Sequence, residues 1–254
     1  MKLKDLLIQL EKYAPKELAQ DWDNVGILIG EPERVVKKVL IALDAGAMGI
    51  DYAIEHGFDL ILTHHPLIFQ PLRNISNPNI IKMIEHKISL ISMHTNFDAA
   101  IGGVNHALAH ALDLEVIDLL GDSSKKELGL LCRASSPQSL SELAASVKEK
   151  LNVPRLRLWT AGQNDEARYH RIAICGGAGG STLPLAEQKA DIFISGDLSY
   201  HSFLDSSIPI IDAGHFYTEY PALEKLAELL IPTGLESFIL PQKMHEWHNY
   251  IRYY

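Results

Sequence analysis

Histidines and acidic residues occur together in three segments of the chain, each directly after an apolar stretch that predicts a strand. In chain order, the segments contribute His64 with His65, His94 with Asp98, and His215 with Glu219. Imidazole nitrogens and carboxylate oxygens are ligands for zinc, iron and manganese, and no cysteine lies in these segments. Because the carboxyl ends of strands in an open α/β sheet converge on one crevice, we expect the three segments to meet at a metal site.

The adjacent pair His64 and His65 indicates two ions rather than one. Pro66 favours an extended backbone at His65, and adjacent side chains of an extended chain point in opposite directions. Each imidazole is therefore better placed to bind an ion of its own. Asp98 or Glu219 can bridge such a pair, since one carboxylate has two oxygens and the ions of two-metal hydrolytic centres lie about 3.5–4 Å apart.

Each of these residues also has a purely structural interpretation. A histidine at a strand end often forms only a structural hydrogen bond. Asp98 can cap the helix predicted near Val104, and Glu219 can be a first-turn acid that the dipole of the helix around Leu223 favours. The joint occurrence of three such segments favours the metal site over these separate explanations.

Short apolar segments alternate with segments of helical periodicity along most of the chain. Near-continuous apolar runs predict buried strands at residues 39–43, 60–62, 89–93, 172–175, 192–194 and 208–211. Apolar residues at three-to-four spacing predict helices at residues 3–10, 80–84, 104–112, 140–151 and 223–230. The alternation predicts an α/β protein with mixed or largely parallel sheets.

A polar run at Gly121–Lys126 interrupts this alternation and predicts an exposed connection. We therefore expect two α/β domains, residues 1–122 and 123–254, each of a common domain size. His215 and Glu219 belong to the second domain, so this domain must contribute ligands to the metal site. The aromatic tail, Trp247–Tyr254, would expose much apolar surface in water and is expected to pack on the protein itself or on a neighbouring subunit.

The composition is that of a soluble globular protein with excess negative charge. The 254 residues include 32 acidic and 23 basic residues, for a formal charge of -9, which disfavours general binding of nucleic acid. No apolar stretch approaches the roughly 18 residues that span a bilayer, and the stretch Leu6–Ile8 is too short for a signal peptide. We expect a cytoplasmic protein that does not bind membranes.

Several familiar catalytic motifs are absent from the sequence. GxxxxGK[ST], GxSxG and HExxH do not occur, and the two cysteines, Cys132 and Cys175, lack CxxC spacing. The glycine-rich segment Gly176–Gly180 follows a predicted strand, but Thr182 stands where a GxGxxG motif requires its third glycine. This segment can present backbone N–H groups to an anion or form only a tight turn, and both interpretations stay open.

Six segments in order resemble the type 2 homologues of GTP cyclohydrolase I, also called the NIF-three-like family. They are Trp22–Gly26 with Gly30, Asp59–Pro66, His94–Asp98 with Gly102–Asn105, Cys175–Ser181, Ser195–Asp197 with His201, and Gly214–Glu219. The resemblance covers residues 3–241 and is to the short two-domain bacterial form. Thr218 stands where the family often has serine, which keeps the hydroxyl group.

The resemblance implies two interlinked α/β domains that assemble into a toroidal homohexamer. It also implies a dinuclear site for two divalent ions (zinc, iron or manganese), with the ligands His64, His65, Asp98, His215 and Glu219. These are residues that the strand-end pattern also selects.

The activity that the resemblance implies is hydrolysis of a small molecule, with metal-activated water attacking C8 of the guanine ring in a nucleotide such as GTP. His94 and His201 are candidates for proton transfer, and Asp197 and Asn96 can orient them. The alternatives are a non-catalytic metal-binding ring that serves as scaffold or regulator, and a metal-dependent peptidase or phosphatase with the same ligands.

Overall fold

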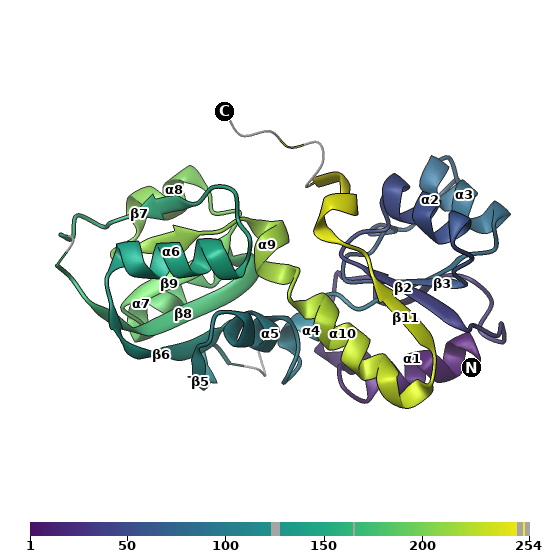
Figure 1. Ribbon diagram of the computed structural model, residues 1–254, viewed down its shortest axis with the longest axis horizontal. Coiled ribbons are helices and arrows are strands. Elements are labelled where there is room, and N and C mark those ends of the chain that lie inside the picture. Colours follow the sequence, from purple (N-terminus) through teal and green to yellow (C-terminus); the bar gives the residue numbers. More distant parts are fainter. Residues whose placement is uncertain (123–127, 165, 248–250, 252–254) are drawn as a thin grey trace. The chain divides into compact units, whose positions relative to one another are not determined.

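The computed structural model describes residues 1–122, 128–164, 166–247 and 251, and it contains two α/β units (Figure 1). The first unit comprises Met1–Ile101 together with Leu223–Trp247, and the second comprises Gly102–Ala222. The chain therefore passes from the first unit to the second and back again. The predicted α/β class is confirmed.

The unit boundary differs from the expected one at residue 122. Strand β5 (Glu115–Leu119) pairs with β6 (Leu130–Gln138) in the second unit, so the chain before the polar run already belongs to that unit. Residues 123–127 of the polar run lie outside the described residues, and so does most of the aromatic tail, so those two expectations stay predictions.

The first unit is built on a five-stranded mixed sheet. Its strands lie in the order β1 (Gly26–Ile29), β4 (Ser89–Ser92), β3 (Leu60–Thr63), β2 (Lys38–Ala42) and β11 (Glu236–Ile239). β1 runs antiparallel to β4, and the other neighbours are parallel. The helices are α1 (Leu3–Glu11), α2 (Ala47–Glu55), α3 (Pro78–Glu85), α4 (Thr95–Ala99) and α10 (Ala222–Leu230), with short 3-10 turns at Lys16–Leu18, Ile231–Thr233 and Gln242–Met244.

Helices cover both faces of this sheet, which explains the continuous apolar strands. Leu40, Ile61 and Leu90 pack with Ile50 of α2 and Met83 of α3 in one core cluster. Figure 1 shows α1 and α10 on the opposite side of the sheet. Successive residues of a strand alternate between the two faces, so a strand covered on both sides must be apolar throughout.

The second unit is built on a six-stranded mixed sheet. Its strands lie in the order β5, β6, β8 (Tyr169–Ala178), β9 (Ile192–Gly196), β10 (Ile210–Asp212) and β7 (Arg157–Trp159). β8, β9 and β10 are parallel, and the other pairs are antiparallel. The helices are α5 (Val104–Ala111), α6 (Leu140–Lys150), α7 (Leu183–Lys189), α8 (Tyr200–Asp205) and α9 (His215–Glu219), with a 3-10 turn at Gly179–Ser181.

Local sequence signals account for several of these helices. At α6, Ser139 accepts a hydrogen bond from the backbone N–H of Glu142, whose carboxylate accepts one from the backbone N–H of Ser139. At α3, Asn77 accepts from the backbone N–H of Asn79, and a proline occupies the first turn. These caps begin the helices where apolar periodicity predicts them.

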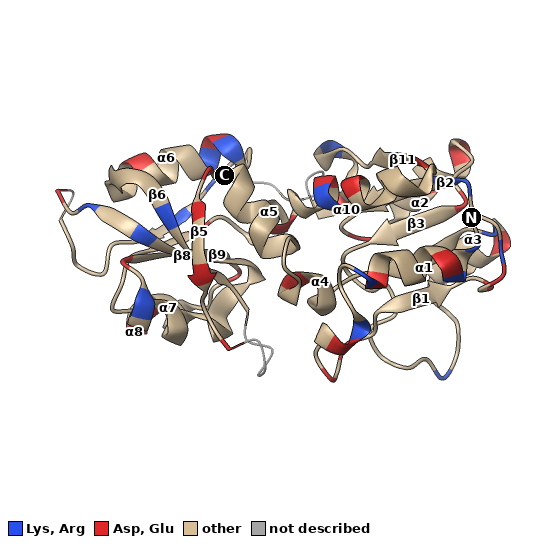
Figure 2. Cartoon of the chain, turned by 90° about the horizontal axis from the view of Figure 1, so that it is seen from below, with Lys and Arg blue, Asp and Glu red and all other residues tan. Residues whose placement is uncertain are grey.

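Charged residues are distributed over both units. Figure 2 shows Lys and Arg interspersed with Asp and Glu along the chain. None of the helices that the structure describes combines the length and apolar character needed to cross a bilayer.

Candidate metal centre

Three parallel strands of the first unit end on polar side chains at one edge of the sheet. Asp44 lies two residues after β2, His64 directly follows β3, and His94 lies two residues after β4. The parallel register pairs Ala42 with Thr63 and Thr63 with Ser92, so these strand ends are level with one another. The predicted gathering of polar residues at the carboxyl edge is therefore present within this unit.

The tautomers of His64 and His65 follow from their hydrogen bonds. His64 is fully buried, and its Nδ1 lies 2.8 Å from the carbonyl oxygen of Met93. The Nδ1 of His65 lies 2.9 Å from Oδ1 of Asp44. Carbonyl and carboxylate oxygens only accept, so each Nδ1 donates a hydrogen. In the neutral rings Nε2 is then the unprotonated nitrogen, which is the form that binds a metal.

His94 is held in the same way by a buried acid. Its Nδ1 donates to Oδ1 of Asp23 at 2.8 Å, and Oδ2 of Asp23 accepts from the backbone N–H and the hydroxyl of Thr95 at 3.0 and 2.5 Å. Burial alone would raise the pKa of Asp23, but the hydrogen bonds from His94 and Thr95 and the charge of His94 lower it to about 2. Asp23 is therefore an anion that holds the His94 ring in place.

The three histidines form one cluster. One ring nitrogen of each lies within 4.8 Å of those of the other two, and the ring centroids are 4.9, 5.2 and 5.6 Å apart. Oδ1 of Asp98, in α4, lies 3.6 Å from Nε2 of His64. Three imidazoles and a carboxylate are a ligand set that zinc, iron or manganese accepts, so the donor chemistry fits a divalent ion.

The second unit places a histidine between two carboxylates. The Nδ1 of His215 lies 3.0 Å from Oδ2 of Asp197, and its Nε2 lies 3.1 Å from Oε2 of Glu219, four residues on in α9. Glu219 is buried. When Nδ1 donates to Asp197, the lone pair of a neutral ring faces the Glu219 carboxylate. A proton or a metal cation between Nε2 and Oε2 removes that repulsion, so this pair also fits a metal.

Glycines bring the strand ends close to these ligands. Gly177 at the end of β8 has φ +67°, and a Cβ at this position would lie 2.1 Å from Oε1 of Glu219 and 3.2 Å from Nε2 of His215. The backbone N–H of Gly177 donates to Oγ1 of Thr218 at 2.9 Å. Gly177 is thus required beside the carboxylate, and the threonine in place of the family's serine still provides its hydroxyl.

The other predicted site residues make contacts that differ from the expected ones. His201 is exposed on α8, where its ring stacks edgewise on Tyr200 and belongs to none of the candidate ligand groups among the described residues. Asn96 is buried and donates to the carbonyl oxygen of Ala14 instead of orienting a histidine. Asp197 orients His215, a predicted ligand, instead of His94 or His201.

The residues that orient the histidines of the first unit were missed in the sequence. Asp44 follows the strand predicted at residues 39–43, so the strand-end pattern was sufficient to find it. Asp23 belongs to the Trp22–Gly26 segment of the family resemblance, but nothing local to it indicates a contact with His94.

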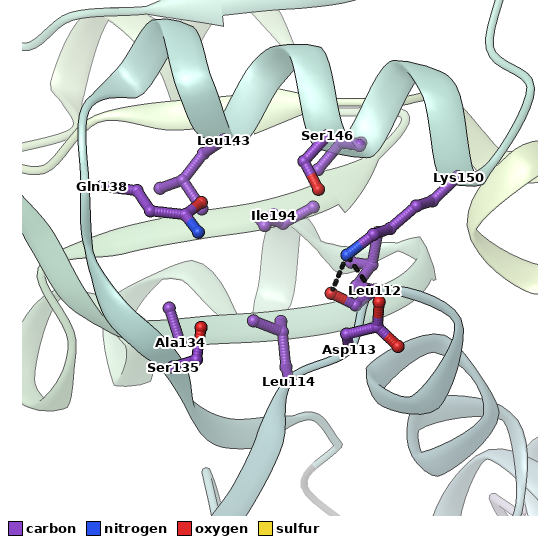
Figure 3. Close-up of a pocket in the computed structure, with 11 residues that line it drawn as sticks. Leu112, Asp113, Leu114, Ala134, Ser135, Gln138, Leu143, Ser146, Lys150 and Ile194 are labelled. Carbon is purple, nitrogen blue, oxygen red and sulfur yellow. Dashed lines mark hydrogen bonds and ion pairs between the residues drawn. The ribbon is translucent and has the colours of Figure 1, made fainter.

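A cavity of about 170 Å³ in the second unit lies apart from these ligands, between α6 and the sheet (Figure 3). Lys150 lies at its edge, where its ammonium donates to the carbonyl oxygen of Leu112 at 2.8 Å and pairs with Asp113 at 3.0 Å. The charge of Lys150 is therefore already matched. None of the predicted metal ligands lines this cavity.

Two mixed sheets with histidine and carboxylate groups at their carboxyl edges define an α/β protein with candidate metal ligands in both units. The chain belongs to the Duf34/NIF3 (NGG1p interacting factor 3) family, whose model matches residues 1–243. The resemblance noted in the sequence is thereby confirmed.

Similar proteins match over nearly their full length. A relative from Lactococcus lactis is 36% identical, with 97% of this chain and 96% of the relative aligned. Another from Clostridium acetobutylicum is 34% identical, with 94% and 95% aligned. Both are named GTP cyclohydrolase 1 type 2 homolog. The crystal structure of a Staphylococcus aureus hypothetical protein has a TM-score of 0.88 at 29% identity and covers 100% of this chain and 99% of that one.

Proposed function

We propose that the protein is a dinuclear metal-dependent hydrolase similar to type 2 GTP cyclohydrolase I, with a purine nucleotide as substrate. Its ligands for two divalent ions (zinc, iron or manganese) are His64, His65, Asp98, His215 and Glu219. The observation that carries the proposal is the histidine cluster of the first unit, in which hydrogen bonds at Nδ1 leave Nε2 of His64 and of His65 as metal-binding nitrogens. The names of the relatives support the nucleotide substrate.

The hydrogen-bonded acids set the orientation of the ligands before any ion binds. Asp44 and Asp197 accept from the Nδ1 of His65 and of His215 at 2.9 and 3.0 Å. Fixing these rings in advance lowers the conformational entropy that binding would otherwise cost. Divalent ions held there would act as Lewis acids and lower the pKa of a water molecule toward neutrality.

His94 is the proton carrier in this proposal. Its Nδ1–H is held by the Asp23 carboxylate, so a proton can be taken up or released only at Nε2. The Asp23 carboxylate fixes the tautomer and orientation of the ring, as in other acid–base sites that pair a histidine with a carboxylate. The proposal assigns proton transfer to His94 and not to His201, which lies exposed on α8.

We also propose that the protein works as a cytoplasmic homo-oligomer, a toroidal hexamer as in the family it resembles. Light scattering at micromolar concentration tests the assembly. A mass of about six times the 28.3 kDa chain is expected, and a mass near that of one chain would refute the oligomer.

A substrate screen tests the proposed reaction. Protein loaded in turn with zinc, iron(II) or manganese is incubated with GTP, dipeptides and phosphoesters, and products are identified by mass spectrometry. The proposal is supported if the protein releases formate from GTP, if Asp98→Asn loses this activity and if the control His201→Ala retains it. Turnover only of dipeptides or phosphoesters identifies a peptidase or phosphatase, and inert protein with two ions bound identifies a metal-binding scaffold.

A further inference from the structure

Two aromatic side chains of the first unit stand exposed beside His94. Trp22 is 55% exposed and Phe69 is 43% exposed. Their ring centroids are 5.4 Å apart, and they lie 6.2 and 6.5 Å from the imidazole of His94. The two rings and the histidine therefore form a single aromatic cluster, with its outer part open to solvent.

The backbone on either side of this cluster is fixed. Asp23, adjacent to Trp22, is bound to both His94 and Thr95. Asn24 donates through Nδ2 to the carbonyl oxygen of Ile68, the neighbour of Phe69, at 2.5 Å. The segments that carry the two aromatic rings are thus tied to each other and to the histidine, which holds their backbone beside His94.

Such an arrangement favours a planar partner. Exposed aromatic area is costly in water, and a flat heterocycle that stacks on it removes that area from solvent. Stacking needs no particular hydrogen-bonding pattern, because every base has a π face. The Trp22 and Phe69 rings stand at 69° and 75° to the imidazole, so a heterocycle stacked on either ring leaves the edge of His94 available for proton transfer.

We infer that Trp22 and Phe69 form the subsite for the heterocyclic base of the substrate, with His94 beside it. This inference rests on the proposed function and deepens it, because it assigns recognition of the base to two residues. It predicts that the site binds a planar nitrogen heterocycle, in preference to a peptide or a simple phosphoester. A second copy of the chain is the competing occupant of the same aromatic surface.

Binding of two matched probes to the full-length, zinc-loaded protein tests the subsite. Guanosine monophosphate and ribose 5-phosphate share the phosphate and the sugar, and only the first has a base. By isothermal titration calorimetry, the wild type is expected to bind guanosine monophosphate at least about tenfold more tightly. Trp22→Ala and Phe69→Ala should each weaken it by about tenfold while binding of ribose 5-phosphate is unchanged, and Trp22→Phe should restore most of the affinity.

Tyr200→Ala is the matched control, because it removes another exposed aromatic ring, 72% exposed, in the second unit. It should bind both probes as the wild type does. Equal affinity of the wild type for the two probes overturns the inference, as does unchanged binding in both alanine variants. A fall in oligomer mass in Trp22→Ala also overturns it and assigns the surface to a second copy.

Metal content separates this inference from the proposed function. Variants that keep two ions per chain and lose only the preference for the base support the subsite. If the wild type binds two ions and hydrolyses its substrate, and Trp22→Ala and Phe69→Ala hydrolyse it equally well, the subsite is refuted. The hydrolase proposal is then still intact.

Discussion

Replacing Gly177 by alanine tests whether the end of β8 is shaped around the Glu219 carboxylate. The residue has φ +67°, a conformation that costs an L-residue roughly 1–2 kcal/mol. The added Cβ would also lie 2.1 Å from Oε1 of Glu219, well inside ordinary contact, so the carboxylate must move. Glu219 is buried and lies 3.1 Å from Nε2 of His215. When a proton lies between these two atoms, moving the carboxylate sacrifices a hydrogen bond between charged groups worth about 1.5–3 kcal/mol.

Gly162 provides the matched control in the same unit. Its φ is +71°, and an added Cβ meets nothing within 4 Å, so Gly162→Ala carries the backbone cost alone. By denaturant titration we expect Gly162→Ala to lower the free energy of unfolding by about 1–2 kcal/mol and Gly177→Ala by about 2.5–5 kcal/mol. Elemental analysis should show fewer bound ions only in Gly177→Ala. Equal losses of stability and full metal content in both variants would refute the reasoning.

The further predictions concern three single side chains. Glu219→Gln keeps the shape of the side chain but loses the charge that offsets the repulsion between two cations. Elemental analysis should therefore show metal occupancy falling from two ions toward one or none in a folded chain. Two retained ions would show that Glu219 is only a first-turn acid of a helix. Asp23→Asn should lower the free energy of unfolding by about 1–3 kcal/mol in denaturant titrations, because it weakens contacts to both His94 and Thr95; wild-type stability would contradict this. Burial raises the pKa of the Cys132 thiol to about 12, so mass spectrometry should detect its alkylation by iodoacetamide at pH 8 only after unfolding. Stability should also fall as the pH rises above about 9, where the thiol ionises in the unfolded chain but not in the folded one. Rapid alkylation of native protein would show that the thiol is accessible.

Most of the interior strands that the structure describes were predictable because both of their faces are covered. Each of the six apolar runs overlaps a strand of the structure, and the five periodic segments correspond to α1, α3, α5, α6 and α10. The four edge strands, β1, β5, β7 and β11, were not predicted, and neither was β6. Edge strands keep exposed residues, as all of β5 does, so their sequences lack a continuous apolar run.

The ligand-bearing helices α4 and α9 also could not be predicted from apolar periodicity. Each has five residues, too few to show a helical repeat. α9 begins after Gly214, whose φ of 81° turns the chain from β10 into the helix. That turn places Glu219 one helical turn beyond His215, which the i, i+4 spacing allowed but did not require.

The sequence by itself determined the residue types and their positions at strand ends: His64, His65 and His94 each follow a buried apolar run, and the six family segments identify them independently. Only the tertiary structure decided which partner holds each ring. Asp23 is 71 residues from His94 in the chain, and Asp44 is 21 residues from His65. The physical reason is that apolar periodicity is a local property of the chain, whereas the hydrogen-bond acceptor of an imidazole depends on the order and register of strands that are distant in sequence.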